Sequence, residues 1–485
     1  MDQQLPHVVV VGGGITGLAA AWYLMQGPHG PRATVTVLEA GERFGGKVAL
    51  HDFAGVELDC GAEALLATRP EAVNLCKDLG LVPVPAVTTQ AAIYSRGRMR
   101  PVPKGLLTGV PTDLRSLAAS GVVSLPGLLR IPLDHLLPRT VMHGDVSVGD
   151  YVATRLGREL TDRLVEPMLG GVYAGRAEDL SLQMTVPSLY RAATTRRSAI
   201  ASASSVLSDG LKTTGPRRGP VFVGLEGGVG RLPQALVTAL RAHGVKLHTS
   251  AVVQQVRSRA ARWDVVTGDG RGRYVTHTAD AVMFATPAPV TGRLLQEVNS
   301  AAAQELAEVE YADVAIVTLG YPTAAARHLR GSGFLVPPVE GYAVKGVTYS
   351  SAKWDWVARQ ARSSDEDGLF IVRASLGRAG DPVVAESSDD ELIRLAADDL
   401  AALTGLPRRP LVEAVTRWQP GLPQYAVGHR ARVADIREEL STTPGLTVCG
   451  AAYEGVGIAA CIGSAQAAVS TVLQELAERM EWDHG

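Results

Sequence analysis

The chain has 485 residues, of which 46% are hydrophobic and 20% charged, a composition typical of a soluble globular protein with two or three domains. Its formal net charge is −2, so no global excess of positive charge indicates nucleic-acid binding or a polybasic membrane anchor. Four scattered cysteines without a CxxC pair predict buried reduced thiols and no metal site. Because the chain passes almost directly into a strand and no apolar run reaches roughly 18 to 20 residues, we expect no signal peptide, no membrane span and a cytoplasmic location.

The N-terminal segment has the pattern of a dinucleotide-binding unit. An apolar strand at residues 7–11 leads through a glycine turn into a helix, and a second strand at residues 34–39 ends in a carboxylate. In such units the three glycines permit a tight turn, a close approach to a pyrophosphate and close helix–strand packing, while the carboxylate binds a ribose hydroxyl. A solvated carboxylate at the strand end is the alternative for the last group. The predicted cofactor contacts are Gly12, Gly14, Ile15, Thr16, Gly17, Glu39 and Ala40.

A glycine pair follows the second strand at once. It allows a second close pass of the backbone beside the dinucleotide, next to cations for the phosphates. This segment resembles the glycine-doublet signature of flavoproteins with an amine-oxidase-like fold, and it favours FAD over NAD. The predicted contacts are Arg43, Gly45, Gly46 and Lys47.

The middle of the chain changes character. Residues 53–81 predict a strand, a turn and a helix, with Arg69 at the loop-to-helix junction. Residues 86–186, rich in leucine and punctuated by proline, predict a helical insertion. Its leucines could contact a bilayer, close over an apolar substrate, or form an ordinary subdomain core. Residues 198–219, rich in Ser, Gly and Arg, predict a mobile loop.

The last part of the chain has two segments with the pattern of the dinucleotide-binding domain, and a different domain lies between them. Residues 221–290 contain a helix and several strands, and residues 291–415 predict a second mixed sheet with helices on one face. A strand at residues 446–450 then leads through two glycines into a long helix, a start that suits the N1/O2 edge of an isoalloxazine. The predicted contacts are Gly450, Val456, Gly457 and Ile458.

These elements predict an α/β protein with a discontinuous Rossmann-like FAD domain. The expected parts are the FAD domain at 1–48, 221–290 and 416–485, a mixed-sheet substrate domain at 49–85, 187–220 and 291–415, and the helical insertion at 86–186, which could face a membrane or act as a lid.

Assembled, the motifs resemble the flavin-dependent porphyrinogen oxidases of haem biosynthesis, in the form found in Gram-positive bacteria. Besides the glycine segments, the resemblance rests on Gly61-Ala62-Glu63, Pro103-Lys-Gly105, Glu166 to Gly175, Thr416-Arg-Trp418, Pro423-Gln-Tyr425 and Gly428-His429. Where relatives often have Gly-Pro-Glu, this chain has Ala62 in the middle. The resemblance adds Gly61, Ala62, Glu63, Val253 and Trp418 to the expected FAD contacts.

The resemblance implies the removal of six hydrogens from coproporphyrinogen III by non-covalent FAD, with O2 as acceptor and H2O2 released. It also implies a soluble or loosely membrane-associated protein, with the next haem-pathway enzyme as a possible partner. The flavin carries the chemistry, so the expected substrate contacts are Arg69 and Lys345 for propionates and Gly171, Val172 and Tyr173 for the cavity wall. Lys345 could instead hold a water near the flavin or be a solvated lysine at a strand edge. We interpret His429 as a structural residue, not a base.

Three alternatives stay open from the sequence. Protoporphyrinogen IX, with two propionates fewer, could be the substrate. An amine oxidase or carotenoid desaturase could share the fold, although residues 420–425 contain no cysteine for covalent flavin attachment. The third alternative belongs to another functional class: the chain could be a non-catalytic relative of the fold that binds protein partners.

Overall fold

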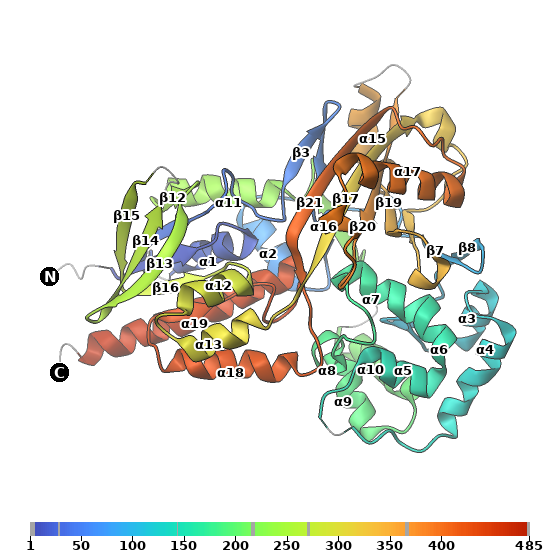
Figure 1. The fold of residues 1–485 in the computed structure, drawn as a ribbon, viewed down its shortest axis with the longest axis horizontal. Coiled ribbons are helices and arrows are strands. Elements are labelled where there is room, and N and C mark those ends of the chain that lie inside the picture. Colours follow the sequence, from blue (N-terminus) through green and yellow to red (C-terminus); the bar gives the residue numbers. More distant parts are fainter. Residues whose placement is uncertain are drawn as a thin grey trace.

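The computed structural model describes residues 5–27, 30–142, 144–214, 219–268, 272–363 and 368–482. The molecule is elongated: both termini lie at one end, and the helices α3 (Leu114–Ser120) and α4 (Leu125–Arg130) lie at the other (Figure 1). A parallel sheet with its helices forms the end that carries the termini. A second sheet and a group of helices form the opposite half.

The first sheet is built from short valine-rich strands buried on both faces. Its order is β12-β2-β1-β16-β22, and every neighbouring pair is parallel. The apolar runs predicted this arrangement, because parallel strands covered by helices need no alternation of polar residues. The strands are β1 (His7–Val11), β2 (Thr34–Leu38), β12 (Lys246–His248), β16 (Ala281–Phe284) and β22 (Leu446–Val448).

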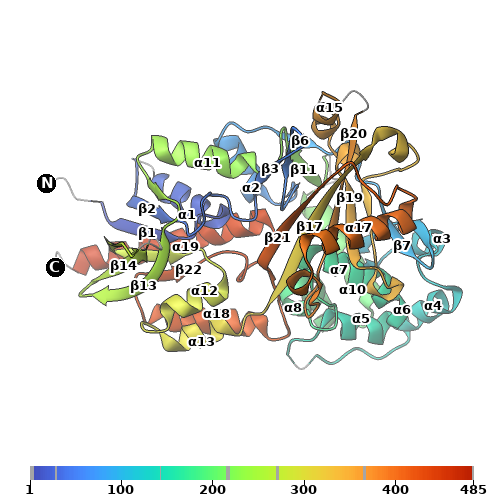
Figure 2. The ribbon, with the colours of Figure 1, turned by 45° about the horizontal axis from the view of Figure 1, so that its top comes forward.

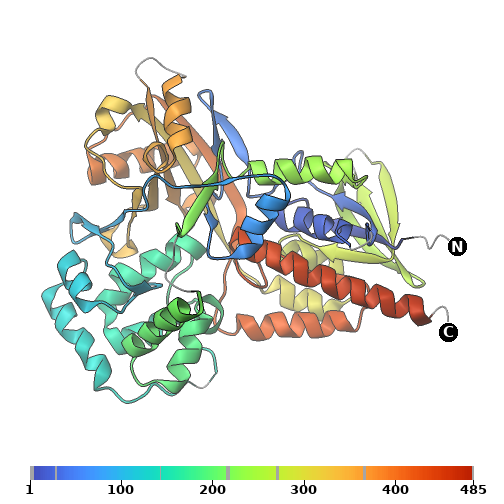
Figure 3. The same cartoon turned by 180° about the vertical axis from the view of Figure 1, so that it is seen from behind.

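The two faces of this sheet bury different layers. Val8 and Val10 of β1 pack in a core with α1 (Ile15–Met25), α2 (Pro70–Asp78), α11 (Arg231–Ala242) and α19 (Ile458–Trp482). Val9 and Val11 pack in a second core with an antiparallel sheet and three helices: β13 (Val252–Arg259), β14 (Arg262–Gly268), β15 (Tyr274–Ala279), α12 (Ala288–Leu295), α13 (Ser300–Ala307) and α18 (His429–Ser441). Seen from behind, α2 lies beside the first half of α19 (Figure 3).

The second sheet has seven strands in the order β21-β17-β20-β19-β18-β7-β8. Only the β18–β7 pair is parallel, which confirms the prediction of a mixed sheet. The strands are β7 (Ala91–Ser95), β8 (Arg98–Pro101), β17 (Tyr311–Pro322), β18 (Gly333–Leu335), β19 (Val344–Tyr349), β20 (Leu369–Leu376) and β21 (Val412–Pro423). Residues expected in the helical insertion and in the last FAD-binding segment thus supply β7, β8 and β21 (Figure 2).

Helices cover both faces of this sheet, so the expectation of helices on one face was wrong. Val372 and Ala374 of β20 pack with α17 (Asp389–Thr404), whereas Leu369 and Ile371 pack on the other side with α15 (Asp355–Ser363) and the hairpin β3–β4. The remaining short elements here are β3 (Leu50–Phe53), β4 (Val56–Asp59), α14 (Ser350–Lys353), α16 (Val383–Glu386) and the 3-10 helices Thr323–Ala326 and Pro338–Glu340.

The helical region has its own hydrophobic core. Besides α3 and α4 it contains a 3-10 helix (Ile131–His135), α5 (Val148–Leu156), α6 (Arg158–Leu160), a π-helical turn (Thr161–Val165), α7 (Glu166–Tyr173), α8 (Leu182–Thr185), α9 (Pro187–Thr195) and α10 (Ala199–Thr214). The strand pair β9 (Leu106–Leu107) and β10 (Val110–Pro111) borders it. In the described part of the chain, no helix combines the length and apolarity needed to span a bilayer.

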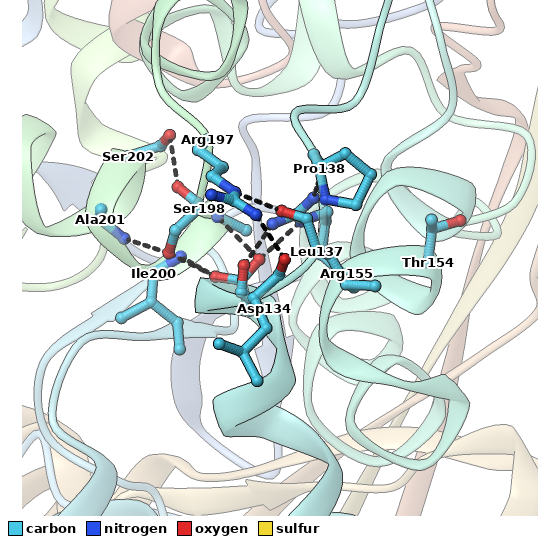
Figure 4. A network of polar contacts seen from close by, with 12 residues as sticks. Asp134, Leu137, Pro138, Thr154, Arg155, Arg197, Ser198, Ile200, Ala201 and Ser202 are labelled. Carbon is cyan, nitrogen blue, oxygen red and sulfur yellow. Dashed lines mark hydrogen bonds and ion pairs between the residues drawn. The ribbon is translucent and has the colours of Figure 1, made fainter.

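Helix α10 replaces most of the loop predicted over residues 198–219, of which 215–218 lie outside the described residues. The cause is a buried carboxylate 65 residues earlier in the chain: Asp134 accepts hydrogen bonds from the backbone N–H groups of Ala199 and Ile200, both at 3.1 Å, and from the Ser198 hydroxyl. Figure 4 shows Asp134 between this helix start and Arg155. A carboxylate at a helix N-terminus stabilises the helix, so the Ser-rich sequence folds as one.

A small three-stranded sheet has the order β5-β11-β6. It contains β5 (Leu65–Leu66), β6 (Pro83–Pro85) and β11 (Phe222–Leu225). The segment after residue 220 therefore pairs with the strands around α2 before α11 and β12 return the chain to the parallel sheet.

Candidate functional site

The first glycine turn closes tightly against the sheet on one side and stays open on the other. Gly12 has φ +105°, and a Cβ there would lie 2.9 Å from the Ala285 carbonyl oxygen. A Cβ on Gly17 would lie 1.9 Å from the Gly12 oxygen, so α1 could not pack on β1. A Cβ on Gly14 would meet only the Gly46 Cα, at 4.0 Å. The turn therefore excludes side chains where helix and strand meet and leaves space at the N-terminus of α1.

Glu39 organises the turn from the end of β2. Its Oε2 accepts a hydrogen bond from the Gly13 N–H and its Oε1 one from the Gly41 N–H, both at 2.7 Å. A carboxylate offers about four acceptor positions, so these bonds leave capacity for a ligand hydroxyl. The neighbouring Ala40 and Arg43 are exposed. Val253 lies in β13, buried in the core that also holds Leu38.

The glycine doublet lies directly against the first turn. The Gly45 N–H donates to the Gly13 carbonyl at 2.8 Å, and Gly45 forms a parallel bridge with Gly14. Lys47 is half-buried, and the partial burial lowers the pKa of its ammonium group. Among the described residues, this ammonium has no hydrogen-bond or ion-pair partner. A half-buried, unpaired cation beside an open glycine turn fits the phosphate of a dinucleotide.

The predicted Gly61-Ala62-Glu63 loop joins the same place. A Cβ on Gly61 would lie 1.9 Å from the Lys47 carbonyl oxygen and 3.3 Å from Trp418 Cζ2. The Trp418 indole N–H donates to the Cys60 carbonyl at 3.3 Å. The backbone of this loop therefore contacts both the glycine doublet and β21 of the seven-stranded sheet.

The loop before α19 is the fourth segment of the site. Together with the first glycine turn, the glycine doublet and the Gly61 loop it forms the open surface that is called the cradle below. Gly450 has φ +126°, its N–H donates to the Ser464 hydroxyl at 3.1 Å, and a Cβ there would lie 3.6 Å from Thr16 Oγ1. Gly457 faces open space, because its Cβ would have no neighbour within 4 Å. Ile15 and Thr16 at the start of α1 thus lie beside the loop that leads through Val456 to α19, which begins at Ile458. Gly14, the N-cap residue of α1, supplies no side-chain hydrogen bond, which leaves the first N–H groups of the helix available to a phosphate.

Sequence reasoning missed two residues of this site, Lys353 and Arg373. Both bind the Glu63 carboxylate: Lys353 Nζ at 2.5 Å to Oε1 and Arg373 Nη1 at 2.6 Å to Oε2, while Arg373 Nη2 donates to the Gly61 carbonyl at 2.6 Å. Burial alone would raise the pKa of Glu63, but the charges and hydrogen bonds of Lys353 and Arg373 outweigh it and lower the pKa to about 2. The one available signal was an arginine inside the apolar strand β20.

Four of the residues expected to contact the substrate lie on two elements that face each other, α7 and β19. Gly171 and Val172 are exposed at the end of α7, and Tyr173 is half-buried, with its pKa raised by burial to about 12. Cβ atoms on Gly171 and Gly346 would lie 3.4 Å and 3.3 Å from the same Leu335 methyl group, so α7 faces β19, the strand of Lys345.

Lys345 and Arg69 differ in their surroundings. Lys345 is only 5% exposed and donates to the Gly377 carbonyl at 2.5 Å. Burial, and then the nearby Arg378, lower its pKa to about 7. It is therefore not a solvated lysine. Arg69 lies at the start of α2, half exposed, in an ion pair with Glu71 at 2.8 Å.

Comparisons with known proteins agree on the family. The model of the flavin containing amine oxidoreductases matches residues 15–473. The coproporphyrinogen III oxidase of Mycobacterium bovis is 36% identical over 472 residues, which cover 96% of this chain and 97% of the relative. That of Bacillus subtilis is 31% identical and covers 98% and 100%. Human protoporphyrinogen oxidase is 30% identical and covers 96% and 98%.

Solved structures agree with the fold. An Exiguobacterium protein assigned as a protoporphyrinogen oxidase has a TM-score of 0.83 at 28% identity, over 98% of this chain and 100% of the other. A cyclohexylamine oxidase of Brevibacterium oxydans has a TM-score of 0.68 at 16% identity, over 97% and 99%, and shows the shared fold alone. The chain therefore belongs to the flavin-containing amine oxidoreductase family and, within it, to the porphyrinogen oxidases.

Proposed function

We propose that this protein uses non-covalently bound FAD to oxidise coproporphyrinogen III to coproporphyrin III. Six hydrogens leave the substrate in pairs, and each pair reduces one O2 to one H2O2. The observation that carries the proposal is the convergence of four glycine-containing segments on one open cradle, beside two elements, α7 and β19, that face each other. The names of the bacterial relatives support the tetracarboxylate substrate.

FAD would supply the chemistry by accepting a hydride from the macrocycle. The chain then has to bind the dinucleotide and orient the substrate. The uncapped start of α1 and the Lys47 ammonium are suited to the pyrophosphate, and Glu39 to a ribose hydroxyl. The start of α19, with Val456 and Gly457, is suited to the edge of the flavin ring on which negative charge accumulates.

Substrate binding calls for cations, because coproporphyrinogen carries four carboxylates. We infer that Arg69 and Lys345 contact propionates and that Gly171, Val172 and Tyr173 form a wall against the macrocycle. Arg69 would have to exchange its exposed pair with Glu71, which costs little because exposed ion pairs contribute about 0 to 1 kcal/mol. Burial lowers the pKa of Lys345 to about 7, and a propionate carboxylate beside it would favour the charged ammonium form.

A second candidate substrate is protoporphyrinogen IX. The 30% identity to human protoporphyrinogen oxidase over nearly the whole of both chains supports this second candidate. Coproporphyrinogen III has two propionates where protoporphyrinogen IX has two vinyl groups. The contacts of Arg69 and Lys345 with propionates should therefore determine which of the two substrates is preferred.

Stopped-flow absorbance under anaerobic conditions tests the proposal. The purified yellow protein is mixed with coproporphyrinogen III or with protoporphyrinogen IX, and the flavin bleaching rate is recorded. We expect faster bleaching with the tetracarboxylate, and one H2O2 for each pair of hydrogens once O2 is admitted. Faster bleaching with protoporphyrinogen IX would select the second candidate. If neither substrate bleaches the flavin, the proposal is wrong.

We further propose that the protein acts in the cytoplasm with a peripheral membrane contact. The support is a row of exposed leucines on the helical region: Leu125, Leu129, Leu133 and Leu136, called the leucine ridge below. Exposed apolar side chains of this kind are typical of a surface that contacts a membrane, and such a contact would hold the protein near the next haem-pathway enzyme, which takes the product.

A further inference from the structure

Residues 424–429, the bridging segment, connect parts of the molecule that are distant in the sequence. The segment follows β21 and is fixed to the helical region by backbone bonds. The Tyr425 carbonyl accepts from the Ser181 N–H at 2.7 Å, and the Gly428 N–H donates to Asp145 Oδ2 at 2.9 Å. The segment therefore joins the helical region to α18, which begins at His429.

The side chains of the bridging segment reach the loop before α19. The Tyr425 ring is fully buried, and its hydroxyl donates to the Ala451 carbonyl at 2.5 Å. The His429 ring stacks on Tyr425 with centroids 4.6 Å apart, and its Nε2 bonds the Ala452 carbonyl at 2.7 Å. Because a carbonyl only accepts, Nε2 carries the proton. Two consecutive carbonyls of the loop are thus held by one stacked pair.

The same tyrosine contacts the predicted substrate wall. The Tyr173 ring of α7 packs on Tyr425 with centroids 5.6 Å apart, and the Gln424 side-chain amide donates to the Tyr173 carbonyl at 2.9 Å. Tyr425 therefore lies between the end of α7 and the loop that opens α19. The spacing between these two elements is set through its ring and hydroxyl.

We propose that Tyr425 and His429 are positioning residues: they fix the loop from Gly450 to Ile458, and with it the reactive flavin ring, relative to the α7 wall. The inference rests on the proposed function for the location of the flavin ring. Hydride transfer depends steeply on such spacing, since a displacement of about 1 Å can cost about 100-fold in rate.

The test is Tyr425→Phe, which removes only the oxygen that holds Ala451. Without substrate, we expect an altered visible spectrum and a shifted midpoint potential of the bound flavin. With substrate, we expect anaerobic flavin reduction to slow by about 10- to 100-fold with little change in KM. The matched control is Tyr321→Phe, because Tyr321 is a fully buried tyrosine of β17 whose hydroxyl has no hydrogen-bond partner among the described residues. This control should leave spectrum, potential and rate unchanged.

Histidine variants keep the inference testable if Tyr425→Phe folds poorly. His429→Leu removes the donor to Ala452, whereas His429→Gln keeps a donor there. We expect the spectral shift with leucine and its partial reversal with glutamine. A wild-type flavin spectrum and potential in both Tyr425→Phe and His429→Leu would overturn the inference. Because these readouts need no substrate, they stay distinct from a failure of either porphyrinogen to bleach the wild-type flavin, which would overturn the proposed function.

Discussion

Gly14 and Gly17 belong to the same turn, but the structure gives them opposite surroundings. A methyl group on Gly17 would overlap the Gly12 oxygen at 1.9 Å, whereas one on Gly14 would have 4.0 Å to its nearest neighbour. Gly14 also has ordinary backbone angles, φ −70° and ψ −179°. The protein itself therefore does not need glycine at position 14. A ligand whose phosphate approaches the backbone there would need it.

Gly14→Ala should leave the apoprotein folded and weaken FAD binding. We expect a change in the free energy of unfolding within about 1 kcal/mol without cofactor. In the wild type, FAD at about 100 times its Kd should stabilise the fold by about 2.7 kcal/mol, a gain that Gly14→Ala should lose. Thermal unfolding with and without FAD measures both. Gly17→Ala should fail to fold even without FAD. If FAD stabilises Gly14→Ala as much as the wild type, FAD does not bind beside Gly14.

At the residue scale, the sequence predicted the site residues that lie close together along the chain. The two glycine turns and Glu39 lie within one short segment, so their spacing alone indicated a dinucleotide site. The partners of Glu63 were not predictable in this way, because Lys353 and Arg373 are 290 and 310 residues away along the chain. The fold brings them together by placing both α14, which ends at Lys353, and β20, which contains Arg373, beside the Gly61 loop.

At the scale of elements, α10 depends on a group outside itself. Asp134 is fully buried and binds the first turn of α10 while Arg155, also buried, donates to Oδ1 at 2.6 Å (Figure 4). Burial alone would raise the pKa of Asp134, but hydrogen bonds from Ser198, Ile200 and Ala199, and from Arg155, lower it. The carboxylate thus holds the 3-10 helix, α5 and α10 together.

Asp134→Ala should unfold α10 or the whole helical region more easily. The variant leaves Arg155 as a buried cation without its carboxylate, which costs about 3 to 5 kcal/mol. Denaturant unfolding measures the loss, and hydrogen exchange of residues 199–208 should show reduced protection. The stabilisation from the lowered pKa is present above about pH 4 and disappears as pH falls through that pKa, so the difference from wild type should shrink in acid.

The matched control is Asp209→Asn on the same helix. Its ion pair with Lys212 is exposed, so the free energy of unfolding should change by less than about 0.5 kcal/mol. Equal losses in both variants would contradict the special role of Asp134.

These elements also show where sequence reasoning stopped. Residues 198–219 have the composition of a loop, and only a carboxylate from another element makes most of them a helix. Strand β7 lies between β8 and β18 in the seven-stranded sheet, and β18 comes about 240 residues later in the chain, so no local pattern encodes that pairing. The strands of the parallel sheet were predictable because their apolar character is intrinsic to each segment.

At the scale of the whole molecule, the leucine ridge has a defined place. The helix α4 that begins it lies at the end opposite the two termini and the parallel sheet (Figure 1). Leu125, Leu129 and Leu136 are 68%, 69% and 71% exposed. Leu125 and Leu129 are four residues apart on α4 and so share a face, and Leu136 follows the 3-10 helix that comes next. Arg139 and Arg197 lie nearby, and both donate to backbone carbonyls. Apolar groups flanked by arginines suit an anionic lipid surface.

The double variant Leu129→Gln/Leu136→Gln should therefore lose membrane affinity without losing activity on dissolved substrate. Burying one leucine contributes about 1.5 kcal/mol or more, so each substitution should weaken binding to phosphatidylglycerol vesicles by about tenfold in co-sedimentation. Binding should also weaken as salt screens the arginines. Val82→Gln, at a 75% exposed valine in the loop after α2, is the control and should bind like the wild type. A wild-type protein that stays in the supernatant at every lipid concentration would show that the leucine ridge does not contact membranes, and an equal loss in Val82→Gln would show that binding is not specific to it.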